Sequence, residues 1–412
     1  METMTPANDE AGIELQFGLE LEFVAPPDPY MSFGYAGFIE RELKEEACFL
    51  RFAKVLGDAG LPAAFGLCLA ETECGDNPHR IEAPAGTLFD NWRVIDPDTI
   101  DVDYANVSKF QYWLLKAESL ESKVPRTWIG TELNSPILHQ SEVQSGLPHV
   151  KRALKAIFNE CKPLGAHINS GCGLHVHVSP ISGLTDIHVK CVAAMLFIID
   201  NHLLYELTSS NRRDEHSAMN KTTFASINHG RSGIDIVRRA SAAGIHDYLP
   251  KSLLDRYGSQ MRNLWEAEGL SDISRAVKGS FQMRGEARAT LRVSLVNTIG
   301  GMSSDTLEFR HAQASFSHKF VGQWTALILA IFKVACLPAP KYKRTMRWLF
   351  NITSTTPKPQ DAWLSLLHTI RNSVPDAWAQ EIDVPYWVER VQENRVKAEP
   401  DVGDDGMAIM DD

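Results

Sequence analysis

The sequence lacks cysteine pairs and long apolar runs, and each absence excludes a class of protein. It has seven cysteines, an odd number, and no two of them form a CxxC pair. This spacing argues against a disulfide framework or a structural zinc site and favours reduced thiols in a cytoplasmic protein. The longest apolar run, CVAAMLFII at 191–199, is too short to cross a bilayer.

The chain also lacks an excess of positive charge. Its formal net charge is −11 over 412 residues, whereas nucleic acids and anionic membranes select for excess Lys and Arg. The first residues, METMTPANDEAG, contain no apolar segment of the kind found in signal peptides. We therefore expect a cytoplasmic protein without a nucleic-acid or membrane partner, and the composition leaves the oligomeric state open.

Alternating and helical patterns predict an α+β fold. Strand-like segments are interleaved with helical ones without a regular βαβ series. Strands are predicted at 15–26, 126–138, 173–179, 288–296 and 305–313, the last two as an antiparallel pair around the turn NTIGGMSS. Helices are predicted at 36–59, 147–165, 185–208, 318–336, 341–352 and 360–372.

We expect a single catalytic domain over residues 14–396, preceded by a disordered leader at 1–13. A variable insertion is expected around 211–286, where no element can be assigned. The last fifteen residues, AEPDVGDDGMAIMDD, carry six acids and no base. This composition predicts that 397–412 is an acidic, disordered tail.

Five predicted strands each combine an apolar face with a polar face, because side chains alternate along a strand. A single strand of this kind is most simply explained by a sheet with one solvated face. Together, however, the polar faces hold Glu, His and Arg and no Lys, which is unusual for a solvated surface. The residues on these faces are Glu20 and Glu22, Glu132 and Asn134, His175 and His177, Arg288 and Arg292, and Glu308 and Arg310.

Such residues on one sheet would suit metal-dependent phosphoryl chemistry. Mg²⁺ takes carboxylate oxygens and substrate phosphates as ligands, and arginine binds phosphate oxygens with a planar fork. The HxH pair of GCGLHVHVSP at 171–180 taken alone leaves zinc and magnesium equally open.

Four motifs occur in an order that resembles a known family. They are GLELEF at 18–23, GTELNSPIL at 130–138, GCGLHVHVS at 171–179 and TLEFRHAQAS at 306–315. FDNWRVIDPDTI at 89–100 and SSNRR at 209–213 add to the likeness. The set resembles the amidoligases, carboxylate–amine ligases of the glutamine synthetase and glutamate–cysteine ligase superfamily. The resemblance implies a curved antiparallel sheet of the glutamine synthetase type, backed by helices, with a helical C-terminal part.

The resemblance also implies a reaction and a set of metal ligands. ATP would activate a carboxylate as an acyl phosphate, and an amine would then displace phosphate to form an amide, isopeptide-like bond. The substrates would be small-molecule or peptide carboxylates and amines, and the cofactors would be two Mg²⁺ or Mn²⁺ ions. The implied metal ligands are Glu20, Glu22, Glu132, His175 and Glu308.

Other positions would handle phosphate. The resemblance implies that His177 lies near the nucleotide phosphates and that Arg310 steadies the transferring phosphoryl group, with Glu308 beside it in a catalytic role. Arg292 is a candidate for binding phosphate or the substrate carboxylate. Where the family usually has H-x-G-T, this chain has HAQAS at 311–315, and we expect Ala314 and Ser315 to reshape the acceptor pocket.

Two other functions stay open. The HxH motif also occurs in zinc amidohydrolases, although these place it on the first strand and use more histidines. A non-catalytic binding protein could keep the same fold. Three residues near the motifs have simpler explanations: His311 as a packed histidine, Cys172 as a small buried residue, and Arg212 as a cation at a helix end.

Overall fold

The architecture is described from a computed structural model of the chain. The described residues are 13–26, 38–66, 80–81, 92–94, 109–118, 120, 128–162, 164–210, 212, 222–225, 244–278, 290–295, 305–355, 361–403 and 405–410. The expected leader at 1–13 lies outside them except for its last residue. Mixed helices and strands confirm the α+β class.

The strands form one open sheet of ten, in the order β3-β4-β2-β5-β6-β1-β8-β10-β9, with β7 also paired to β1. All pairs are antiparallel except β2 with β5. The strands are β1 (Leu15–Ala25), β2 (Ala63–Gly66), β3 (Arg80–Ile81), β4 (Trp92–Val94), β5 (Trp113–Ala117), β6 (Ile129–Asn134), β7 (Leu138–His139), β8 (Gly173–Pro180), β9 (Leu291–Ser294) and β10 (Thr306–Gln313). The five predicted motif strands are therefore neighbours, from β6 through β1, β8 and β10 to β9.

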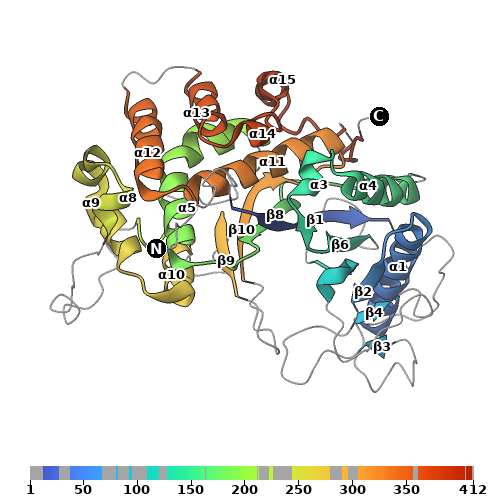
Figure 1. Cartoon of the computed structure of the whole chain (residues 1–412). Helices are drawn as coiled ribbons and strands as arrows, with labels where there is room; N and C mark the ends of the chain where they lie inside the picture. Colours follow the sequence, from blue (N-terminus) through green and yellow to red (C-terminus); the bar gives the residue numbers. More distant parts are fainter. Residues whose placement is uncertain are drawn as a thin grey trace, which may run out of the picture.

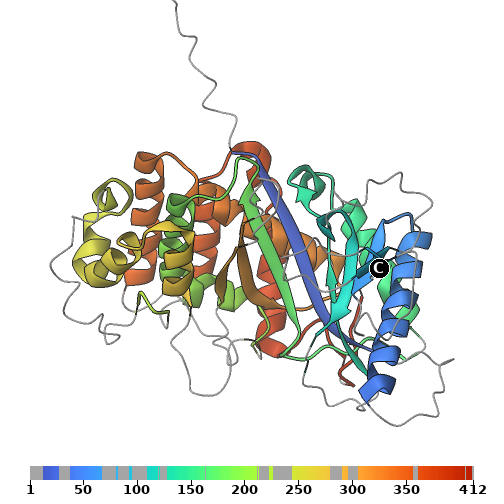
Figure 2. The ribbon, with the colours of Figure 1, turned by 90° about the horizontal axis from the view of Figure 1, so that it is seen from below.

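Helices of the C-terminal half lie over one face of this sheet (Figure 1), and the view from below shows the strands in front of them (Figure 2). The helices that match the predictions are α1 (Phe38–Asp58), α4 (Pro148–Cys161), α5 (Asp186–Ile199), α11 (His318–Ala335), α12 (Ala339–Ser354) and α13 (Ala362–Arg371). Shorter or unpredicted ones are η3 (Lys109–Gln111), α3 (Ser141–Gln144), η4 (Asp200–Leu204), α6 (Tyr205–Leu207), α8 (Ile245–Tyr248), α9 (Lys251–Trp265), α10 (Gly269–Val277), α14 (Asp376–Ala379) and α15 (Val384–Val396). The described part of 211–286 thus includes three helices, of which α10 packs on β9 and α5.

Strand β1 shows why the sheet has a covered face and an open face. Its odd-numbered side chains from Leu15 to Phe23 are buried, whereas Gln16, Gly18 and Glu20 are only half-buried. The rings of Phe23 and Phe316 pack edge to face, 5.4 Å apart. Burial of the apolar face fixes the strand register, because a shift by one residue would turn the carboxylates into the core.

Within the described residues, one helix is long and apolar enough to be tested as a membrane span, Asp186–Leu207. It comprises α5, the π-helical turn η4 and α6. Its most apolar window is 67% buried inside the fold, and α5 packs on α10, α11 and α12. This packing is typical of the central helix of a soluble protein.

The C-terminal segment is ordered, which contradicts one prediction. Both guanidinium NH groups of the buried Arg390 donate to Asp401 at 2.7 Å. Met407 forms a β-bridge with His167, which in turn bridges to Val24 at the end of β1. The prediction of a disordered tail is therefore wrong for 397–403 and 405–410. Amino-acid composition alone does not reveal the bidentate ion pair and the β-bridges that hold this acidic segment against the rest of the fold.

Candidate functional site

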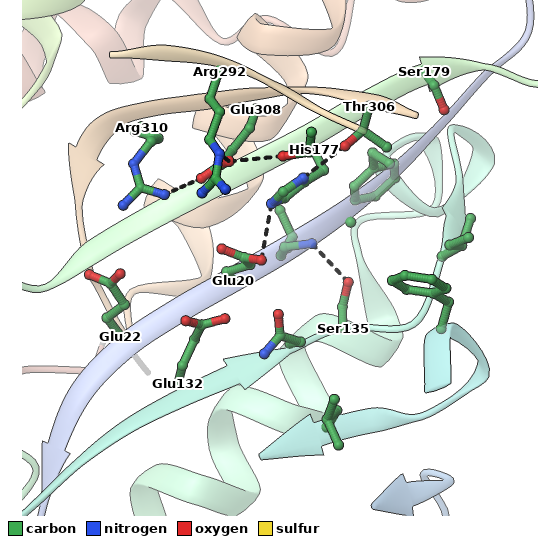
Figure 3. A pocket seen from close by; sticks show the side chains of 18 of the residues that line it. Glu20, Glu22, Glu132, Ser135, His177, Ser179, Arg292, Thr306, Glu308 and Arg310 are labelled. Carbon is green, nitrogen blue, oxygen red and sulfur yellow. Dashed lines mark hydrogen bonds and ion pairs between the residues drawn. The ribbon is translucent and has the colours of Figure 1, made fainter. Parts of the chain in front are cut away.

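The open face of the sheet forms a cavity of about 470 Å³. Side chains from six strands line it: β1, β5, β6, β8, β9 and β10. Seven of the predicted site residues are among them: Glu20, Glu22, Glu132, His177, Arg292, Glu308 and Arg310 (Figure 3). The eighth, His175, is 1% exposed and is not among the residues that line the cavity.

Strand register explains why these residues meet. Gly18 of β1 is opposite His177 of β8, and His177 is opposite Glu308 of β10. Glu20 is opposite His175. Directly paired residues on one face have side chains within about 5 Å of each other. These three pairings therefore bring carboxylates and imidazoles from distant parts of the chain close together.

Glu20, His177 and Glu308 form the first acidic group. One potential ligand atom from each lies within 4.8 Å of the others. His177 Nε2 is 3.1 Å from Glu20 Oε1, and Thr306 Oγ1 lies 2.9 Å from His177 Nδ1, which fixes the ring. The Nε2 contact lacks hydrogen-bond geometry, so this buried nitrogen has no hydrogen-bond partner.

His175 is buried against three carboxylates of the site. Its Nδ1 lies 3.0 Å from Glu20 Oε2 and 3.5 Å from Glu308 Oε1, and its Nε2 lies 3.6 Å from Glu22 Oε1. The resemblance assigned metal binding to His175 and phosphate contact to His177. In the structure, His177 faces the cavity and His175 touches three carboxylates from the buried side.

Two arginines flank Glu308. Arg310 forms an ion pair with Glu308 Oε1, and Arg292 Nε lies 3.8 Å from Glu308 Oε2. Ser294 Oγ donates a hydrogen bond to the same Oε2 at 3.1 Å. Arg292 is the more exposed arginine, with 58% of its side chain accessible against 20% for Arg310, so Arg310 is held in the wall and Arg292 stands at the opening.

Glu22, Glu118 and Glu132 form the second acidic group, again with potential ligand atoms within 4.8 Å of one another. Lys116 of β5 forms an ion pair with Glu132, Nζ to Oε1, at 3.0 Å. On the other side, Glu22 Oε2 accepts a hydrogen bond from the backbone N–H of Gly173 at 2.5 Å.

Gly173 is needed for this close packing. A Cβ at position 173 would lie 2.3 Å from His175 Nε2 and 2.6 Å from a guanidinium nitrogen of Arg212. Arg212 is buried and donates to the backbone carbonyl of Ser170 at 2.7 Å. It therefore supports the turn before β8 instead of ending a helix in solvent.

The carboxylates of the site differ in the direction of their pKa shifts. Burial acts to raise the pKa of Glu20, but the charge of His177, the hydrogen bond with His175 and the close contact with His177 Nε2 hold it well below the usual value. The pKa of Glu308 is also lowered, because attraction by His177 and Arg310 outweighs burial. Burial, and then repulsion by Glu20, raise the pKa of Glu132 well above normal in spite of Lys116. Glu20 and Glu308 thus lose their protons more readily than Glu132 does.

Several residues of the site were not predicted from the sequence. The polar faces of the five predicted strands contain no Lys, but Lys116, on a further strand, lines the cavity beside Glu118. Both lie on or next to β5, which was not predicted. The signal was present in WLLKAE at 113–118, where Lys116 and Glu118 alternate after an apolar run. Ser294 and Thr306, which hold Glu308 and His177, were missed because a hydroxyl on a strand carries no specific signal.

Other expectations can be compared with the structure. His311 is fully buried, with Nε2 2.8 Å from Asp200 Oδ1, as expected for a packed histidine. Burial raises the pKa of the Cys172 thiol to about 12, which makes it a poor nucleophile. Ala314 and Ser315 are buried and are not among the side chains that line the cavity, so they do not reshape its wall. The side chains of Trp92, Arg213 and Arg288 lie outside the described residues.

Comparison of the sequence with protein-family models finds no match, and comparison with curated proteins finds none either. The functional interpretation therefore depends on the site itself. Its two acidic groups contain five carboxylates and one histidine. Oxygen-rich groups of this kind suit hard cations such as Mg²⁺ or Mn²⁺, whereas zinc sites use more nitrogen and sulfur ligands.

Proposed function

We propose that this protein is a cytoplasmic, ATP- and Mg²⁺-dependent carboxylate–amine ligase, built on a sheet of the glutamine synthetase type. It would form an amide bond through an acyl phosphate. One observation carries the proposal: Glu20, His177 and Glu308 converge in a cavity whose wall also holds Arg310, ion-paired to Glu308. Cation ligands and a phosphate-binding side chain thus share one face.

The first acidic group fits a divalent cation. Glu20 and Glu308 both have lowered pKa values and offer anionic oxygens. His177 Nε2 is buried 3.1 Å from Glu20 Oε1, so a nitrogen ligand lies beside the carboxylate oxygens. A bound Mg²⁺ or Mn²⁺ would neutralise the charge of phosphate oxygens during transfer.

The chain's own residues would divide the remaining tasks. Arg310, held in the wall by Glu308, presents a fixed cation to a transferring phosphoryl group, and such contacts are worth roughly 10³-fold or more in phosphoryl transfer. Arg292 at the opening can bind a phosphate or the substrate carboxylate with its planar fork. His175 keeps Glu20 and Glu308 in place.

The test is turnover of ATP by the pure protein with Mg²⁺ and a panel of amino acids, peptides and amines. We expect ADP and phosphate release that depends on both a carboxylate and an amine, and amide product by mass spectrometry. Glu308→Ala should abolish turnover, and Glu389→Ala, an exposed glutamate on α15, should not change it.

Other outcomes would favour the alternatives. Amide hydrolysis that needs zinc and no ATP would support an amidohydrolase. Binding of ATP without turnover of any panel member would support a non-catalytic binding protein. If ATP neither binds nor turns over, the ligase proposal fails.

A further inference from the structure

Strand β10 contains a β-bulge in its second half. Phe309 and Ala312 pair with residues of β8 that are only two positions apart, so β10 has one residue more than β8 between these two pairs. A bulge interrupts the hydrogen bonds of the ladder and redirects the side chains of the bulged residues, and bulges are frequent beside active sites. The two residues within this bulge are Arg310 and His311.

The two residues of the bulge point to opposite sides of the sheet. Arg310 lines the cavity, where it is ion-paired to Glu308 (Figure 3). His311 is fully buried, with its ring 6.5 Å from that of Trp324 on α11 and its Nε2 2.8 Å from Oδ1 of Asp200. A contact that holds His311 therefore also holds the stretch of backbone that carries Arg310.

Asp200 lies at a second irregularity of the chain. It is 1% exposed and begins the π-helical turn η4, which separates α5 from α6 in the central helix. A π-helical turn inserts an extra residue into a helix, and such turns are frequent at functional sites. The contact between Asp200 and His311 thus joins the irregular turn of a buried helix to the bulge of a strand that lines the cavity.

The backbone of the bulge is held differently on its two sides. On the β9 side, the N–H of Arg310 donates to the carbonyl of Thr290 at 2.9 Å. On the β8 side, the regular pairing stops after Phe309 and resumes at Ala312. The buried contact of His311 is therefore the side-chain link that holds the bulge where the ladder is interrupted.

We propose that Asp200 and His311 are positioning residues for Arg310: their buried contact fixes the bulge, and the bulge aims the guanidinium group into the cavity at the phosphate that it would bind. The inference rests on the proposed function only for the role of Arg310 in binding phosphate. That the contact holds this arginine in the cavity wall is a separate claim, which can be measured without any substrate.

Chemical modification tests the proposal one arginine at a time. The full-length protein is treated with phenylglyoxal, and the rate of adduct formation at each arginine is measured by peptide mass spectrometry. In the wild type, Arg310 should react more slowly than Arg292, because 20% of its side chain is exposed against 58%. Asp200→Ala should raise the rate at Arg310 towards that of Arg292, because the bulge is no longer fixed.

A second variant breaks the same contact from the other side. His311→Leu should raise the rate at Arg310 as Asp200→Ala does, and combining the two changes should not raise it further, because both remove one contact. The combined variant also removes both polar side chains from the core, which is less destabilising than removing one member of a buried pair. It therefore carries the test if a single variant does not fold.

Internal controls separate positioning from general loosening of the fold. Arg390 is buried and Arg344 is exposed on α12, and the rates at both should be the same in the wild type and in the variants. Tyr342→Phe removes a buried hydrogen bond to the carbonyl of Cys191. It is the control for lost stability and should leave Arg310 at the wild-type rate.

Three results would overturn the proposal. They are an unchanged rate at Arg310 in the single and combined variants, an equal increase at Arg310 and Arg390, and an unchanged kcat for ATP turnover in variants whose Arg310 reacts faster. We expect kcat to fall in these variants. A wild type without ATP turnover would instead overturn the ligase proposal alone, because the modification rates do not depend on turnover.

Discussion

His175 and Glu20 face each other across the paired strands β8 and β1, with 3.0 Å between His175 Nδ1 and Glu20 Oε2. The histidine is almost inaccessible, whereas the glutamate reaches the cavity. A buried imidazole that touches three carboxylates sets where their oxygens point.

His175→Ala should weaken Mn²⁺ binding by about 10- to 100-fold, the usual effect of removing a residue that orients metal ligands. The proposed ligands Glu20, His177 and Glu308 would still be present but less well fixed. Electron paramagnetic resonance titration measures the effect. His139→Ala, at an exposed position, is the control, and equal affinities for the two variants would show that His175 does not position the site.

Gly173→Ala should damage both stability and metal binding. The added methyl group would lie 2.3 Å from His175 Nε2, and such overpacking costs about 1–3 kcal/mol in free energy of unfolding. Urea denaturation measures the loss. Gly322→Ala on α11 is the matched control, because its nearest neighbour would be 3.5 Å away and alanine favours a helix. Equal stability of both variants and wild type would contradict this packing.

The C-terminal segment should contribute to global stability. Asp401→Ala leaves Arg390 buried without its bidentate partner, and uncompensated buried charges cost about 3–5 kcal/mol. Glu393→Ala removes a carboxylate from the same arginine, but Glu393 is 60% exposed and 3.8 Å away, so we expect a change below about 0.5 kcal/mol. Chemical denaturation compares the two, and similar losses would mean that the segment is not held by Asp401.

Stability should rise with pH above about 8 because of Lys333. Burial lowers the pKa of this lysine to about 8, while in the unfolded chain it is about 10.4. Between these values the unfolded state binds the proton and the folded state does not, so raising the pH favours folding, by about 1–3 kcal/mol after allowing for partial solvent contact. Below pH 8 both states are protonated and the contribution is constant.

The comparison variant is Lys333→Met, which keeps the apolar stem but cannot titrate. Lys333 Nζ donates to the carbonyl of Ile13 and to Gln140 Oε1, and the neutral amine can still donate to both. The difference in unfolding free energy, wild type minus variant, should therefore increase from pH 7.5 to pH 10. A difference that is flat or decreases with pH would refute the assignment.

Much of the fold was predictable because its strands and helices have clear local patterns. Alternation in β1 and β8 identified Glu20 and His177, and strand pairing then brought them together. The strand β5 was missed because it is short and its apolar residues are consecutive, so the position of Lys116 could not be inferred. The sequence could not predict which histidine lines the cavity either. Alternation puts His175 and His177 on the same face of β8, and their different exposure depends on the side chains of the neighbouring strands.

The position of β1 at the centre of the sheet has a consequence for synthesis of the chain. This strand leaves the ribosome before both strands that flank it, since the partner residues of Glu20 are Asn134 in β6 and His175 in β8. Until β8 is made, β1 has an apolar face and at least one unpaired edge, which is the usual condition for unwanted association between nascent chains. Folding must therefore wait for distant strands, and production of the protein should be more sensitive to chaperone capacity than that of a protein whose neighbouring strands follow one another in sequence.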